Sequence, residues 1–83
     1  MMKITKEAAM AFIRFRLALI AQAGNRERLS RLVEIGREDL ELIVKLRLID
    51  YEEQIQLQCE MSEAVQHRLT ELNRPVTRLR VVG

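Results

Sequence analysis

The segment from residue 8 to residue 21 contains twelve apolar residues out of fourteen, and the two exceptions are Arg14 and Arg16. The segment is too short for a membrane span, which needs about 20 apolar residues, and it carries two guanidinium groups at its centre. It is also too apolar for a helix that exposes one full face to water, because such a helix carries a polar stripe. We therefore predict a helix that is covered on more than one side.

The chain offers little material for that covering. It has 83 residues, enough for one domain, and a domain of this size buries only about 60–65% of the surface that its unfolded form exposes. Small domains usually gain stability from a disulfide, a metal or a second subunit. Cys59 is the only cysteine and His67 the only histidine, so an internal disulfide is excluded and a closed four-ligand metal site is not expected. Association with a second copy or another protein remains as the source of additional stability.

The composition predicts an all-α fold, because the chain is rich in helix-forming residues and has one proline and three glycines. A first helix is predicted over residues 5–23, with Thr5 as its N-terminal cap. Gly36 is predicted to end a short second helix over 26–35, and a third helical segment follows over 37–49.

Residues beyond Asp50 allow two interpretations. Apolar and polar residues alternate strictly over 54–60, which is the periodicity of a strand, and a short strand there is the alternative. We prefer a helix over 50–72, because glutamine, glutamate and methionine are not typical of strands and no hairpin partner is evident. We thus expect a bundle of three to four helices, completed by dimerisation, as a single domain over 1–75 with a basic, flexible tail over 76–83.

Charge is segregated along the chain. Residues 1–37 carry a net charge of +5, residues 38–63 carry −6, and residues 64–83 carry +3. Arginine clusters bind phosphate through forked hydrogen bonds, which predicts nucleic-acid contact at the two basic ends. The alternative is that the basic ends neutralise the acidic middle, within one chain or across a dimer. The residues expected to contact nucleic acid are Arg26, Arg28, Arg31, Arg74, Arg78 and Arg80.

Arg14 and Arg16 are interpreted differently. They lie two residues apart, about 200° around a helix, so they cannot share one narrow solvent-facing stripe. We expect at least one of them to lie at the edge of a buried face and to pair with an acid of another helix, such as Glu38, Asp39 or Glu41. The buried face itself is predicted to be an interface with a partner, formed by Met10, Phe12, Ile13, Phe15, Leu17 and Ile20.

Enzymatic chemistry is not expected. The chain has no glycine-rich phosphate loop, no spacing of metal ligands and no paired acid and base. We expect His67 to be solvated or hydrogen-bonded, and Cys59 to pack as a small apolar side chain. A helix-turn-helix at Gly36 is also disfavoured, because acidic residues 38–41 would then face the DNA phosphates. No cofactor and no small-molecule ligand are predicted.

Two short patterns resemble small bacterial regulators. The order of LIAQ at 19–22, RLVEI at 31–35 and VKL at 44–46 resembles FlhD, the D subunit of the flagellar master activator, over roughly residues 9–50 with gaps and without about one helix of that family. VQHRLTEL at 65–72 is similar to a motif of the Hha family of nucleoid-associated modulators, although Gln66 stands where that family has an acidic residue. Both resemblances imply a small helical protein that controls transcription through a protein partner.

These observations predict one function and one alternative. The first is a bacterial transcriptional regulator or regulator subunit that acts as a homodimer or with a second regulatory protein, and contacts DNA through its arginine-rich ends. The alternative is a protein-interaction module, such as an adaptor, a secretion chaperone or a phage- or plasmid-borne antagonist, without nucleic-acid contact. A cytoplasmic location and no membrane partner are expected, because a single reduced thiol fits that compartment and no signal peptide is recognised.

Overall fold

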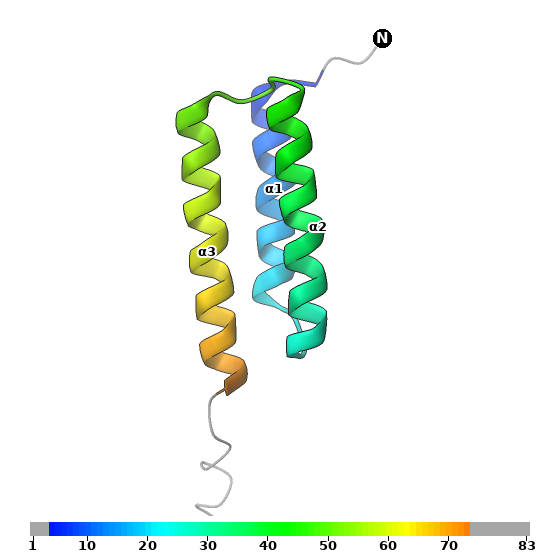
Figure 1. Cartoon of the computed structure of the whole chain (residues 1–83), viewed down its shortest axis with the longest axis vertical. Helices are drawn as coiled ribbons and strands as arrows, with labels where there is room; N and C mark the ends of the chain where they lie inside the picture. The colour runs from blue at the N-terminus through cyan, green and yellow to red at the C-terminus, as the bar shows by residue number, and fades with distance from the viewer. Residues whose placement is uncertain (1–3, 74–83) are drawn as a thin grey trace, which may run out of the picture.

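Three helices make up nearly all of residues 4–73, the part of the chain that the computed structural model describes. The helices are α1 (Lys6–Ala21), α2 (Arg26–Lys45) and α3 (Tyr51–Asn73). They lie side by side and run alternately down, up and down in Figure 1, with α3 on the left, α2 on the right and α1 between them, partly behind α2. This arrangement confirms the predicted all-α bundle.

The alternative of a short strand at 54–60 is wrong, because α3 runs through this segment without interruption. Leu57 and Met61, one helical turn apart, are buried, whereas the intervening Cys59 is exposed. The burial therefore follows the helical period of 3.6 residues, and the alternation of residue types is incidental. The expectation that Cys59 packs as an apolar side chain is wrong for the same reason.

Side-chain caps begin the first two helices where the sequence favours them. The Thr5 hydroxyl accepts a hydrogen bond from the Ala8 backbone N–H at 3.1 Å, and the Asn25 side chain accepts one from the Arg28 N–H at 2.8 Å. Each bond satisfies a backbone donor that the first turn of a helix leaves unpaired.

The connection between α2 and α3 begins with a defined backbone geometry at the end of α2. Arg47 adopts a φ of 60°, and the N–H groups of Arg47 and Leu48 donate to Val44 and Ile43 carbonyls at 2.9 and 3.0 Å. This is the Schellman pattern of hydrogen bonds, with arginine at the left-handed position that glycine usually occupies.

A reciprocal pair of hydrogen bonds starts α3. The Asp50 carboxylate accepts from the Glu53 N–H, and the Glu53 carboxylate accepts from the Asp50 N–H, each at 2.8 Å. This capping box satisfies two backbone donors at once. It also lowers the pKa of Glu53, and the hydrogen bond from the Asp50 backbone is the main cause.

Gly36 does not end a helix, so the predicted boundary between 26–35 and 37–49 is wrong. α2 is continuous from Arg26 to Lys45, and Gly36 is buried at its centre. A β-carbon built on Gly36 would lie 3.2 Å from the Met61 methyl carbon and 3.8 Å from Ile20 Cδ1. The glycine costs helical stability, of the order of 1 kcal/mol, but leaves room for these two side chains.

The core lies along one seam of each helix. Ile13, Ile20 and Leu57 are completely or almost completely buried, and Leu17 is 9% exposed. Ile13, Leu17 and Ile20 were predicted to form an interface with a partner; they are instead buried against α2 and α3 of the same chain, and Met10, predicted with them, is partly buried against this core. The full core consists of Ala9, Ile13, Leu17, Ile20, Ala23, Leu29, Leu40, Ile43, Ile49, Leu57 and Met61.

None of the three described helices has the length and apolar character that crossing a membrane requires.

Candidate interaction surfaces

The Arg16 side chain joins α1 to α2. Its Nε donates to the Asp39 carboxylate at 2.7 Å, and the guanidinium carbon lies 5.0 Å from the centre of the Phe12 ring. The contact with Asp39 confirms the expectation that an arginine of this segment pairs with an acid of another helix. Because Arg16 also covers one side of Phe12, the ion pair and the ring together mark the edge between α1 and α2.

Arg14 points the other way, toward α3. Its Nε and a terminal nitrogen donate to the two carboxylate oxygens of Glu60 at 3.1 and 3.0 Å, a forked pair. The hydrogen bond from Arg14 lowers the pKa of Glu60 below its ordinary value of 4.5. The partner therefore differs from the acids at 38–41, and the two arginines diverge as their spacing requires.

Lys6 forms a third connection. Its ammonium group lies 2.9 Å from the Glu53 carboxylate at the start of α3, which raises the pKa of Lys6. Three of the four charged residues of α1 therefore pair with neighbouring helices, and the fourth, Glu7, lies in its first turn.

The outward face of α1 consequently carries apolar side chains without charge. Phe12 is 43% exposed and Phe15 is 58% exposed. Leu19 is half-buried on the same stripe, and the exposed residues Ala8, Ala11 and Ala18 surround the two rings. Residues at spacings of three and four share one side of a helix, so these side chains form one continuous surface. We call it the outer face of α1.

Exposed apolar side chains of α2 extend this surface beyond α1. Leu42 and Leu46 are 52% and 56% exposed and lie one turn apart. Leu42 follows Asp39 by three residues, and Asp39 is the residue that pairs with Arg16 beside Phe12. The sequence signal for this exposure is that the apolar residues over 40–49 span a face wider than one neighbouring helix can cover.

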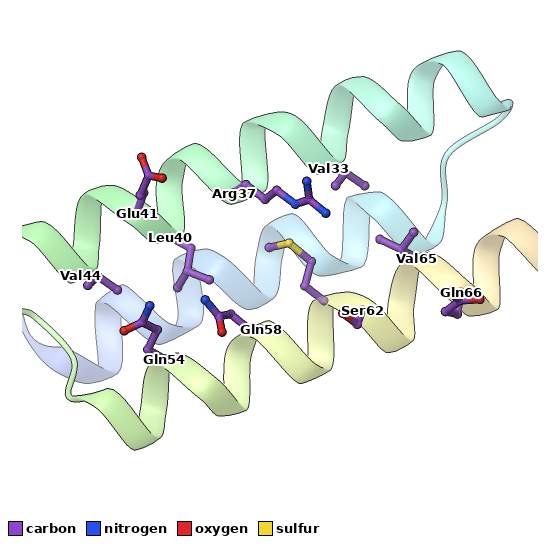
Figure 2. Close-up of a pocket in the computed structure, with 11 residues that line it drawn as sticks. Val33, Arg37, Leu40, Glu41, Val44, Gln54, Gln58, Ser62, Val65 and Gln66 are labelled. Atoms are coloured by element: carbon purple, nitrogen blue, oxygen red, sulfur yellow. The ribbon is translucent and has the colours of Figure 1, made fainter.

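A groove separates α2 from α3 on the other side of the bundle (Figure 2). It has a volume of about 600 Å³. Apolar residues including Leu40, Met61 and Val65 line it together with polar side chains, among them Arg37 on α2. Along α3 the polar residues recur every fourth position: Gln54, Gln58, Ser62 and Gln66.

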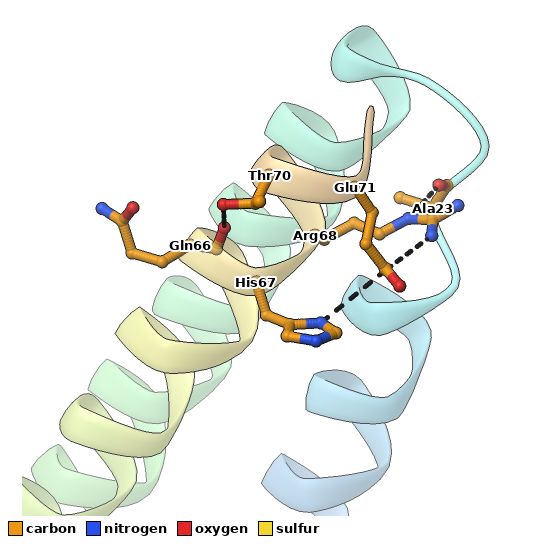
Figure 3. Close-up of polar contacts among 6 residues, drawn as sticks. All are labelled: Ala23, Gln66, His67, Arg68, Thr70 and Glu71. Carbon is orange, nitrogen blue, oxygen red and sulfur yellow. Dashed lines mark hydrogen bonds and ion pairs between the residues drawn. The ribbon is translucent and has the colours of Figure 1, made fainter. Parts of the chain in front are cut away.

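Arg68 ties the end of α3 to the turn between α1 and α2 (Figure 3). Its Nε donates to the Ala23 carbonyl at 2.8 Å, and a terminal nitrogen lies 2.9 Å from the Glu71 carboxylate. His67 is exposed beside them, with Nδ1 3.7 Å from Glu71, which confirms the expectation of a solvated histidine. Arg68 therefore stabilises the packing of α3 against the turn between α1 and α2.

The arginines predicted to contact nucleic acid divide into two groups. Arg26, Arg28 and Arg31 lie exposed on the first turns of α2, and their side chains form no ion pair within residues 4–73. The acidic residues Glu27 and Glu34 share this part of the helix. Arg74, Arg78 and Arg80, and the predicted tail over 76–83, lie outside the described residues.

Metal-ligating side chains are not clustered in the described part of the chain. Within residues 4–73 no group of three or more histidine, cysteine, aspartate or glutamate side chains is placed to hold a metal ion. Cys59 is a free thiol exposed on α3.

Comparison of the chain with protein-family models, with curated proteins and with solved structures finds no match in any of the three. The resemblances to FlhD and to the Hha family therefore remain predictions.

Proposed function

We propose that this chain is a protein-interaction module, a small helical subunit that acts by binding another polypeptide through the outer face of α1. The observation that carries the proposal is the exposure of Phe12 and Phe15 on a surface of apolar side chains, with Arg16 at its edge. Isolated exposed apolar residues are ordinary, but contiguous apolar patches on soluble domains mark sites of association.

The energetic scale supports this proposal. The exposed fractions of the two rings, 43% and 58%, together amount to about one whole phenylalanine side chain. Covering that surface removes on the order of 200 Å² from water, which is worth about 5 kcal/mol before the cost of association. Leu42 and Leu46 on α2 add to the surface that a partner would cover.

A role as a subunit of a transcriptional regulator is the second candidate function. It is supported by Arg26, Arg28 and Arg31, which are exposed at the N-terminal end of α2, where the helix dipole also favours an anion. The protein contact remains the primary proposal because Glu27 and Glu34 reduce the positive charge of this region. The outer face, in contrast, is apolar, and the guanidinium at its edge, Arg16, is paired with Asp39.

We propose a cytoplasmic location, because the single cysteine is exposed on α3 and an exposed thiol persists best in a reducing compartment.

Site-specific photo-cross-linking tests the primary proposal. A photoreactive phenylalanine analogue at Phe15 should capture a protein in cells of the organism that expresses the chain. The same analogue at Tyr51, an exposed aromatic residue on α3, is the matched control and should capture much less. Equal capture at both positions, or none at Phe15, would contradict the proposal.

Binding to DNA at two salt concentrations tests the second candidate. Replacing Arg28 and Arg31 with alanine should weaken binding and reduce its salt dependence, since each arginine that contacts a phosphate displaces a counterion. An unchanged affinity would exclude this region of α2 as a DNA contact. The Arg68→Ala variant is not a suitable control, because Arg68 supports the fold.

A further inference from the structure

The outer face of α1 has a spacing that is the same in both directions. Ala8, Phe12, Phe15 and Leu19 follow one another at intervals of four, three and four residues, symmetric about the midpoint between residues 13 and 14. In a pair of subunits related by a two-fold axis, each contact between two different residues occurs twice. A helix whose contact residues are symmetric about one point can therefore pack on an antiparallel copy of itself.

We infer that the occupant of the outer face is a second copy of this chain, with the two α1 helices antiparallel and the two-fold axis near residues 13 and 14. This inference rests on the proposed function and specifies its partner. Phe12 of one copy then faces Phe15 of the other, and Ala8 faces Leu19. The small side chain lies opposite the larger one, which is the complementarity that close helix packing needs.

The charges on α1 are compatible with this pairing. A self-association face places every side chain near its own symmetry mate, so an unpaired charge close to the axis would repel its copy. Arg14 and Arg16 flank the proposed axis, and each is turned aside and paired within its own chain, to Glu60 and to Asp39. The centre of the face is therefore free of like-charge repulsion.

The area of this face can be compared with the area that a dimer interface needs. α1 has 16 residues and is thus about 24 Å long, and a second helix at an interaxial distance of 8–10 Å makes the face roughly 20 Å wide. The projected area is about 480 Å², more than half of the ~800 Å² per partner that stable interfaces bury, and the ridged surface of two helices exceeds its projection. Leu42 and Leu46 supply the second helix of this face.

Light scattering over a range of protein concentrations tests the inference. The full chain should have twice its monomer mass of 9.7 kDa. Phe15→Glu should lower the association constant at least tenfold without loss of helical circular dichroism, while the matched variant Tyr51→Glu on α3 should leave it unchanged. A monomeric wild-type chain at high concentration, or a dimer unaffected by Phe15→Glu, would overturn the inference.

Disulfide cross-linking tests the direction of the pair. In a background that carries Cys59→Ser, a mixture of Ala8→Cys and Leu19→Cys chains should form a mixed disulfide on oxidation. Ala8→Cys alone should not, because its two copies lie about 16 Å apart along the antiparallel helices. Efficient cross-linking of Ala8→Cys to itself would overturn the antiparallel arrangement.

Failure of the inference can be separated from failure of the proposed function. If the chain is monomeric and the photoreactive group at Phe15 captures a different protein, the second copy is excluded as the occupant while the interaction function stands. If that group captures nothing, both fail.

Discussion

The two apolar faces of α1 differ in what covers them. The inner face, which includes Ile13 and Ile20, is buried by α2 and α3 of the same chain, whereas the outer face leaves Phe12 and Phe15 43% and 58% exposed. Both faces are apolar in sequence, and Arg14 and Arg16 between them are held in ion pairs at the flanks. One helix can therefore stabilise a fold with one side and offer a binding surface with the other.

Replacing a residue of the inner face should give the largest change in stability. Ile13→Ala removes a completely buried side chain and should lower the free energy of unfolding by about 2–5 kcal/mol. Urea denaturation followed by circular dichroism measures it. A cost below about 1 kcal/mol would mean that the inner face is less tightly packed than its burial indicates. Assembly defects in variants at Ile13 report loss of the fold and not of the interface.

Gly36→Ala tests how closely α2 packs on the inner side. The substitution should raise the free energy of unfolding by about 0.5–1 kcal/mol, because alanine stabilises the helix interior and the flexible end of Met61 can move by the few tenths of an ångström required. Gly36→Val should instead destabilise, since its γ-methyl groups would meet Met61 and Ile20. Destabilisation by alanine would show that Met61 is held rigidly. Thermal denaturation of the three proteins side by side distinguishes the cases.

The carboxylates at the border between the two faces of α1 should make the stability of the fold depend on pH. Glu60 and Glu53 have lowered pKa values, through hydrogen bonds from Arg14 and from the Asp50 backbone respectively. A carboxyl group with a lowered pKa stabilises the fold above its unfolded value of about 4.5, and this contribution disappears as the pH falls through the lower folded value. Urea midpoints measured from pH 6 to pH 3 should therefore decrease. Glu60→Gln should flatten part of that decrease, and an identical pH profile would show that the Arg14 pair contributes nothing.

The outer face should contribute least to the stability of a single chain. Phe15→Ser, measured in dilute solution, should change the free energy of unfolding by no more than about 0.5 kcal/mol, because the side chain is mainly in water in the isolated chain. The contrast with Ile13→Ala, only two residues away, is the most direct test of the comparison. A cost close to that of Ile13→Ala would mean that Phe15 belongs to the core.

Local signals in the sequence predicted the helices but not which apolar residues would be exposed. The Thr5 cap and the break between the first two helices were predicted, and Asn25 caps the second of these helices. Gly36 was misinterpreted because a glycine that ends a helix and a glycine that admits a neighbouring side chain look alike until the neighbour, Met61, is placed. A helix over 50–72 was preferred because glutamine, glutamate and methionine are not typical of strands, and α3 confirms this helix.

Apolar residues of α1 could not be divided between core and surface from the sequence, because both groups have helical spacing. Ile13 and Phe15 differ only in which helices lie opposite them, and that depends on how the whole bundle assembles. The spacing of Arg14 and Arg16 showed that they point apart, and the acid at 39 was among those expected. Glu60 was missed because it is 46 residues away in sequence, and no local pattern links it to Arg14.

The divergent ion pairs of Arg14 and Arg16 also bear on the chirality of the bundle. After α1 and α2 form a hairpin, α3 can pack on either of its sides, and apolar seams alone discriminate poorly between the two mirror-related topologies. Here Arg16 meets an acid of α2 and Arg14 meets an acid of α3. The opposite topology would carry α3 to the other flank and separate Arg14 from Glu60. Two arginines spaced by two residues thus favour one handedness of a fold that apolar patterning leaves ambiguous.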